Sequence, residues 1–184
     1  KRLYAVGECA SMYHGANRLG GNSLLAAIRS GNVAANSING LEEHSQSIDF
    51  NDYINTQKES LKINLASQSK FSAIYIRYEI AKIMDNCLGI TRNEEKLRKG
   101  IEDIEYYIGV SEQLNFDSDV SFYVSYSLKS LLVLAKAILL SALERKETRG
   151  AHIRIDYPSK NEEYSKASYI SYMNGSYKVE FIKE

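Results

Sequence analysis

The stretch "LLVLAKAILLSAL" at residues 131–143 is the most apolar part of the chain and predicts the helix around which the fold is built. It belongs to a predicted helical segment at residues 122–145, which is apolar on nearly every side except at Lys129 and Lys136. A helix of this kind is buried in a core or crosses a membrane. Its unbroken apolar runs are far shorter than the ~20 residues that a spanning helix needs. We therefore predict the central helix of a bundle and no insertion into a membrane.

Three further helices are predicted on the N-terminal side of this segment, at residues 51–65, 69–88 and 93–109. In the last of them, apolar residues recur at helical spacing, with charged residues on the other sides. The pattern predicts that these segments pack around the central helix. The middle of the chain, residues 41–146, is therefore expected to form a bundle domain of about four helices.

The C-terminal segment at residues 147–184 has a different pattern. The run "SYISYMNGSYKVEFI" at residues 168–182 alternates apolar and polar residues on both sides of Asn174-Gly175. An Asn-Gly pair tolerates positive φ at both central positions of a type I′ turn. The segment therefore predicts a C-terminal β-hairpin.

The N-terminal segment at residues 1–40 predicts a strand, a loop and a helix. "LYAV" at residues 3–6 is typical of a short strand, and residues 23–38 are typical of a helix rich in small residues, with Asn22 or Ser23 as its N-cap. A domain seldom opens with a buried strand whose partners are missing, so we expect a fragment of a longer protein. The predicted fold class is mainly α.

Charge and cysteine content exclude some classes of function. The chain has 23 basic and 23 acidic side chains, so it lacks the basic face that nucleic-acid binding needs. Cys9 and Cys87 lie far apart and lack metal-ligand spacing, which predicts two reduced thiols in a cytosolic protein. No metal site is predicted.

The loop before the N-terminal helix holds residues suited to binding an anion. Gly20 and Gly21 let the backbone come close to a ligand, and the start of the following helix directs free N–H groups outward. Arg18 adds a planar donor fork that fits a carboxylate or a phosphate, and Glu8 can accept hydrogen bonds from hydroxyl groups. These residues indicate an anionic, hydroxyl-bearing ligand, although a Gly-Gly pair before a helix also forms a simple turn.

Two longer motifs carry a family resemblance. "LYAVGECASMYHGANRLGGNSLLAAIRSG" at residues 3–31 resembles the late FAD-binding segment of the succinate dehydrogenase/fumarate reductase flavoprotein subunit. "ETRGAHIRIDYP" at residues 147–158 resembles the arginine-rich segment near the C-terminus of the same family. L-aspartate oxidase is a relative with similar motifs, so the resemblance leaves the particular activity open.

The resemblance implies a set of site residues. Glu8 would contact FAD, and Ser23 and Leu24 would meet the flavin ring through their backbone. Arg18 matches the family arginine that holds a dicarboxylate substrate. The family's glycine-rich fingerprint and its proton-transferring arginine lie upstream, so no catalytic residue is expected in this chain and most of the FAD would be bound elsewhere.

Other motif residues are expected to have structural roles. His14 and Asn17 would shape the loop. Arg149, His152 and Arg154 match the second motif, and we expect them to hold the helical domain against the flavin domain.

The resemblance implies hydride transfer at flavin N5 between succinate and fumarate in the whole protein, with an iron–sulfur subunit as partner. The 184-residue fragment is expected to be inactive alone. The location implied is cytoplasmic, free or peripheral on the cytoplasmic face of a membrane. Two alternatives stay open: a flavoenzyme of the L-aspartate oxidase type, and a non-catalytic helical module at residues 51–184 that docks an iron–sulfur protein.

Overall fold

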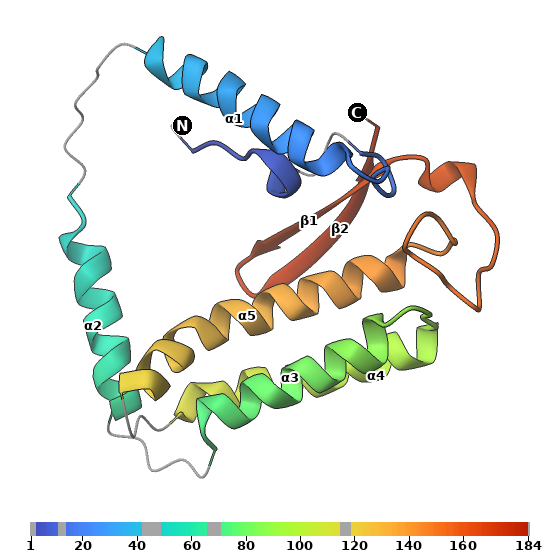
Figure 1. Ribbon diagram of the computed structural model, residues 1–184. Helices are drawn as coiled ribbons and strands as arrows, with labels where there is room; N and C mark the ends of the chain where they lie inside the picture. Colours follow the sequence, from blue (N-terminus) through green and yellow to red (C-terminus); the bar gives the residue numbers. More distant parts are fainter. Residues whose placement is uncertain (1–2, 11–13, 42–48, 66–70, 115–118, 184) are drawn as a thin grey trace. The chain divides into compact units, whose positions relative to one another are not determined.

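A computed structural model describes residues 3–10, 14–41, 49–65, 71–114 and 119–183. The chain divides into two compact units, Lys1–Asp49 and Phe50–Glu184. Figure 1 shows that the first unit contains one long helix, while the second contains the remaining helices and a hairpin. The two units are described separately below.

The first unit consists of a short 3₁₀ helix, Gly7–Ala10, packed against α1, Asn22–Asn39. The backbone N–H of Gly7 donates to the hydroxyl of Ser30 over 2.8 Å, and that hydroxyl donates to the carbonyl of Ala26 over 2.7 Å. A Cβ at Gly7 would lie 3.3 Å from that of Ala27, so glycine permits the close approach. These contacts fix residues 7–10 beside the second turn of α1.

Two local expectations for this unit were wrong. Residues 3–6 have no regular secondary structure where a strand was predicted. A strand needs a backbone partner, and the strands of the described residues pair only with each other. The N-cap of α1 is Gly21, at φ 82°, rather than Asn22 or Ser23, and no side chain caps the helix. Glycine takes this position because the left-handed conformation is unfavourable for other residues.

The core of the second unit lies between three helices: α3, Ala73–Leu88; α4, Glu94–Val110; and α5, Asp119–Glu144. The predicted central helix supplies six of the thirteen core residues, more than any other helix. A fourth helix, α2, Asn51–Leu65, forms where it was predicted, but its described side chains contribute nothing to the buried core. The core comprises Ala73, Ile76, Ile80, Cys87, Leu97, Ile104, Leu114, Leu128, Leu132, Ala135, Leu139, Ala142 and Leu143.

Side-chain caps fix the N-termini of α3 and α4, and one close contact sets the distance between the two helices. The side chain of Ser72 accepts from the amide of Tyr75 at the start of α3. Asn93 caps α4 in the same way. Gly100 of α4 is buried where a Cβ would lie 2.6 Å from the Sγ of Cys87. The absence of a side chain at Gly100 lets the two helices approach closely.

The C-terminal hairpin is confirmed. Strands β1, Ala167–Met173, and β2, Ser176–Ile182, are antiparallel and joined at Asn174-Gly175, whose φ angles of 50° and 80° are those of the predicted turn. The hairpin packs on α5 (Figure 1), and the hydroxyl of Tyr177 donates to the carbonyl of Val133 over 3.3 Å.

One helix in the described part of the chain, α5 at Tyr123–Glu144, is long and apolar enough to cross a bilayer by length and composition alone. Leu128, Leu132 and Leu139 on this helix are fully buried against α3 and α4. That burial is typical of the central helix of a bundle, which can be as long and apolar as a membrane-spanning helix.

Candidate functional site

The N-terminus of α1 leaves backbone donors free. Gly21 stands before it in the left-handed region, and the amide of Asn22 donates to the carbonyl of Leu19 over 3.3 Å. The amides of Ser23 and Leu24 have no hydrogen-bond acceptor among the described residues, because no side chain caps the helix. Free amides at a helix N-terminus form a site for negative charge, which the macrodipole also favours.

The two charged residues predicted beside this helix start are both exposed. Arg18 lies in the loop before α1, and Glu8 lies in the 3₁₀ helix. Neither forms an ion pair with the described residues. The hydrogen bond from Gly7 to Ser30 keeps Glu8 beside α1, at the level of Ala27 and Ser30. Arg18 and the amides of Ser23 and Leu24 therefore lie at the start of α1, whereas Glu8 lies beside a later part of the helix; none of them has a partner among the described residues.

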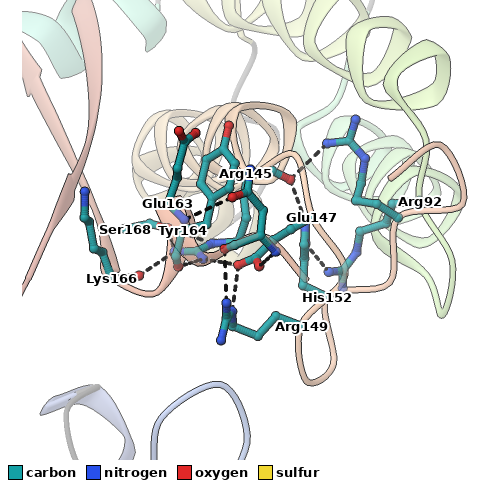
Figure 2. A network of polar contacts seen from close by, with 11 residues as sticks. Arg92, Arg145, Glu147, Arg149, His152, Glu163, Tyr164, Lys166 and Ser168 are labelled. Carbon is teal, nitrogen blue, oxygen red and sulfur yellow. Dashed lines mark hydrogen bonds and ion pairs between the residues drawn. The ribbon is translucent and has the colours of Figure 1, made fainter. Parts of the chain in front are cut away.

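The second motif forms a dense polar network in the other unit (Figure 2). Glu147 lies at its centre and is fully buried. Its Oε1 accepts from Arg145 Nη1 at 2.7 Å and from Arg149 Nε at 2.8 Å, and its Oε2 accepts from the amide of Asn161 at 2.9 Å. Burial raises the pKa of Glu147, but these hydrogen bonds outweigh burial and hold the pKa below its ordinary value. Glu147 is therefore a carboxylate in the folded chain.

Arg145 joins the end of α5 to the start of the hairpin. Its guanidinium donates to the carbonyl of Tyr164 at 2.8 Å and to the carbonyl of Lys166 at 2.7 Å. It also donates to the hydroxyl of Ser168. Arg145 thus uses its donors within the unit and positions the chain that leads into β1 (Figure 2).

Arg154 joins two helix ends. It is fully buried, and its Nη1 donates to the carbonyls of Ala142 at 2.8 Å and Leu143 at 3.1 Å, near the C-terminus of α5. Its Nε and Nη2 both bind the carboxylate of Asp156 at 2.8 Å. The same carboxylate accepts from the amide of Glu94 at the start of α4. The Arg154 guanidinium lowers the pKa of Asp156 to about 2.

His152 contacts both the connection between α3 and α4 and the end of α5. Its Nδ1 lies 2.9 Å from Arg92 Nη1, and its Nε2 lies 3.0 Å from the carbonyl of Arg145. Arginine can only donate and a carbonyl can only accept, so Nδ1 is the acceptor and Nε2 carries the proton. The geometry therefore specifies a neutral imidazole.

These hydrogen bonds place Arg149, His152 and Arg154 in the packing of the second unit. The sequence also expected them to hold the helical domain against a flavin domain, and that expectation remains a prediction. Sequence reasoning missed Arg92, because nothing local links it to a motif 60 residues further along the chain. Glu147 and Asp156 stand inside the motif at residues 147–158. Their position beside the arginines of that motif could have predicted that they form ion pairs with them. Among the described residues, no group of three or more His, Cys, Asp or Glu gathers as a metal site.

Comparison with known proteins finds a matching family model for each end of the chain. Residues 77–183, more than half of the chain, match the family model described as fumarate reductase flavoprotein C-terminus. Residues 1–24 match a model of the FAD binding domain. The chain belongs to the succinate dehydrogenase/fumarate reductase flavoprotein family. The predicted cofactor, FAD, is confirmed at the level of the family, although the chain holds only a small part of the FAD binding domain.

Similar proteins of this flavoprotein family come from several organisms. The fumarate reductase flavoprotein subunit of Haemophilus influenzae is 35% identical, over 98% of this chain and 32% of the relative. The succinate dehydrogenase flavoprotein subunit of Bacillus subtilis is 30% identical, over 88% of this chain and 30% of the relative. An L-aspartate oxidase of Pyrococcus horikoshii is 34% identical, over 92% of this chain and 29% of the relative.

The flavoprotein fold is seen in solved structures as well. A quinol–fumarate reductase solved with menaquinol molecules matches with a TM-score of 0.83 and 24% identity, over 98% of this chain and 34% of that chain. The chain spans about a third of the length of the curated relatives it matches. The solved structure supports the fold, while the sequence relatives support a family of FAD-dependent oxidoreductases.

Proposed function

We propose that this chain is the C-terminal part of a flavoprotein subunit that interconverts succinate and fumarate. Bound FAD would supply hydride chemistry at flavin N5. The residues of this chain would bind the cofactor and orient the substrate. The division proposed is residues 1–40 as the last segment of the FAD-binding domain, 41–146 as the helical bundle and 147–184 as the C-terminal segment.

The uncapped start of α1 is the observation that carries this proposal. The free amides of Ser23 and Leu24 fit an acceptor with negative charge, such as a reduced flavin ring. A Cβ at Gly20 or Gly21 would meet no atom within 4 Å, so the backbone there is open to a ligand. Exposed Glu8 could accept hydrogen bonds from hydroxyl groups of the cofactor. The residues present therefore fit FAD.

Arg18 is proposed to bind one carboxylate of the substrate. Its guanidinium is exposed, stands in the loop before the free amides and has no ion pair among the described residues. A guanidinium can hold a carboxylate with two parallel hydrogen bonds, which fixes orientation as well as position. The H. influenzae and B. subtilis relatives are named for fumarate and succinate, which supports a dicarboxylate at this position.

The proposal extends to partner and location. An iron–sulfur subunit would accept or supply electrons, and the assembled protein would be cytoplasmic, free or peripheral on the cytoplasmic face of a membrane. The 184-residue chain alone would be inactive and would bind FAD poorly. Purification of the chain without flavin absorbance would agree with this, whereas a yellow, active chain would contradict it.

The test is Arg18→Ala in the whole flavoprotein, with Arg18→Lys beside it and Arg29→Ala on the exposed face of α1 as a matched control. We expect Arg18→Ala to lower kcat/KM for succinate oxidation by about 100-fold or more, because a preorganised charged donor is lost. Flavin content should stay unchanged in Arg18→Ala, and Arg29→Ala should keep its turnover. Unchanged turnover in Arg18→Ala would refute the assigned role.

A second candidate is an enzyme of the L-aspartate oxidase type, which the P. horikoshii relative favours. Turnover of the whole protein with aspartate and with succinate separates the two activities directly. A third reading treats residues 51–184 as a docking module without catalysis. Capture of an iron–sulfur protein by the 184-residue chain, with no turnover by the whole protein, would favour that reading.

A further inference from the structure

Hydrogen bonds join the loop that contains His152 to the connection between α3 and α4. Two of them are between backbone groups and one is between side chains. The amide of Arg92 donates to the carbonyl of Ile153 over 2.9 Å, and the amide of Ile155 donates to the carbonyl of Arg92 over 3.0 Å. Beside these two, Arg92 Nη1 donates to His152 Nδ1 over 2.9 Å. We call these three hydrogen bonds the latch.

The latch depends on the protonation state of one group. Nδ1 of His152 accepts from Arg92, and Nε2 donates to the carbonyl of Arg145. A second proton can only go to Nδ1, where it would face the Nη1–H of Arg92 and remove the acceptor. The hydrogen bond from Arg92 can therefore form only when His152 is neutral.

The charges around His152 oppose a second proton. From the α3–α4 connection it is faced by Arg92, from the end of α5 by Arg145, and from its own loop by Arg154. The two nearby carboxylates, Glu147 and Asp156, are bound to arginines. Burial lowers the pKa of His152, and repulsion from these guanidinium groups lowers it further, against the hydrogen bond to the Arg145 carbonyl. Glu147 and Asp156 both have lowered pKa values, so they stay charged on mild acidification.

We propose that His152 is a pH-sensitive latch residue: protonation at Nδ1 breaks the hydrogen bond from Arg92 and weakens the latch between the α3–α4 connection and the 145–156 loop, while the Asp156–Glu94 hydrogen bond still joins that loop to α4. The direction follows from linkage. When the folded pKa is lower than the unfolded one, the unfolded or open state binds more protons, so stability is complete above the ordinary pKa and falls with pH below it. This device is independent of the proposed oxidoreductase activity.

The first measurement follows the imidazole of the full 184-residue chain by NMR. The chain has three histidines, so His14→Gln/His44→Gln leaves His152 as the only imidazole signal. At pH 7.5 we expect the Nε2–H tautomer, and on acidification a midpoint below the ordinary 6.5. A protonated ring at pH 7.5, or no titration down to pH 5, would overturn the proposal.

The second measurement follows the latch itself by amide hydrogen exchange. We expect the protection of the Arg92 and Ile155 amides, corrected for intrinsic rates, to fall by about tenfold for each pH unit below about 6.5, until His152 is protonated in the closed state. The amides that pair β1 with β2 serve as the reference and should keep their protection. Equal protection of Arg92 and Ile155 at pH 7.5 and pH 5 would overturn the proposal.

Two variants separate a switch from a simple packing role. Asn places an amide oxygen near the position of Nδ1 and does not titrate, so His152→Asn should remove the pH dependence of the Arg92 and Ile155 amides. Arg92→Gln removes one repelling charge, so it should shift the His152 midpoint upward. If His152→Asn does not fold, the midpoint in Arg92→Gln still decides, because an unchanged midpoint would contradict the contact between the two side chains.

Discussion

Arg18 in the first unit and Arg154 in the second are both motif arginines, but the structure uses them in opposite ways. Arg18 is exposed and has no ion pair among the described residues. Arg154 is fully buried, and it donates to Asp156 and to the carbonyls at the end of α5. One guanidinium keeps its donors available, while the other has used them in folding.

The difference separates residues that hold a fold from residues available to a ligand. A buried guanidinium is tolerated only when its charge is paired and its donors are satisfied, which is the condition of Arg154. The exposed guanidinium of Arg18, before the uncapped start of α1, makes no ion pair that holds the described part of the fold together. The same contrast extends to the carboxylates, since Glu147 is buried among donors and Glu8 is exposed. Function is therefore expected in the first unit and stability in the second.

Arg154→Met should produce the largest loss of stability. It removes the bidentate partner of Asp156 and leaves the carbonyls of Ala142 and Leu143 without a donor. Asp156 is exposed and can be solvated, so the cost comes mainly from the two buried carbonyls left without a donor, at about 1–3 kcal/mol each in the free energy of unfolding. Urea unfolding of the full chain, followed by far-ultraviolet circular dichroism, measures it.

The matched control is Lys146→Met, which changes an exposed cation in the same loop to the same residue. We expect it to alter the free energy of unfolding by less than about 0.5 kcal/mol. If the two variants changed the free energy of unfolding by similar amounts, burial and pairing of Arg154 would contribute nothing to stability. The contrast drawn between Arg18 and Arg154 would then be wrong.

Gly100→Ala should give an intermediate loss. The new Cβ would lie 2.6 Å from the Sγ of Cys87 and 3.4 Å from Leu139, so α3 or α5 has to shift. Overpacking of this kind costs about 1–3 kcal/mol, and the better helix propensity of alanine offsets part of it. Gly109→Ala is the control in the same helix: its Cβ meets nothing within 4 Å, so we expect a gain of up to about 1 kcal/mol. Thermal unfolding distinguishes the two, and equal shifts would contradict close packing at Gly100.

The parts of the fold that sequence could predict are those whose determinants are local. Asn174-Gly175 fixes a turn by its own backbone preference, so the hairpin was predicted with its turn at the observed position. Helical spacing located α4 to within a residue at each end, and the apolar run at residues 131–143 located α5. The loop residues around Arg18 were predicted as site residues because they stand together in one long motif, and their role stays a prediction.

The parts that could not be predicted depend on partners distant in the chain. Residues 3–6 have the composition of a strand but lack a strand to pair with among the described residues. Arg92 lies 60 residues before His152, and only the folded bundle brings the two together. The N-cap of α1 was misassigned because Asn22 and Ser23 are good cap types, whereas the loop gives that place to a left-handed Gly21.

Arg18→Ala should have the smallest effect on stability, although the largest effect on turnover is assigned to it above. Its side chain is exposed and pairs with no carboxylate among the described residues, so truncation removes no contact that the fold needs. We expect the free energy of unfolding to change by less than about 0.5 kcal/mol, as for an ordinary surface substitution. Urea unfolding of the full chain measures it beside Arg154→Met, on the same signal. A loss of 2 kcal/mol or more would mean that Arg18, like Arg154, uses its donors to hold the chain, and an arginine so used could not also be free for a carboxylate ligand.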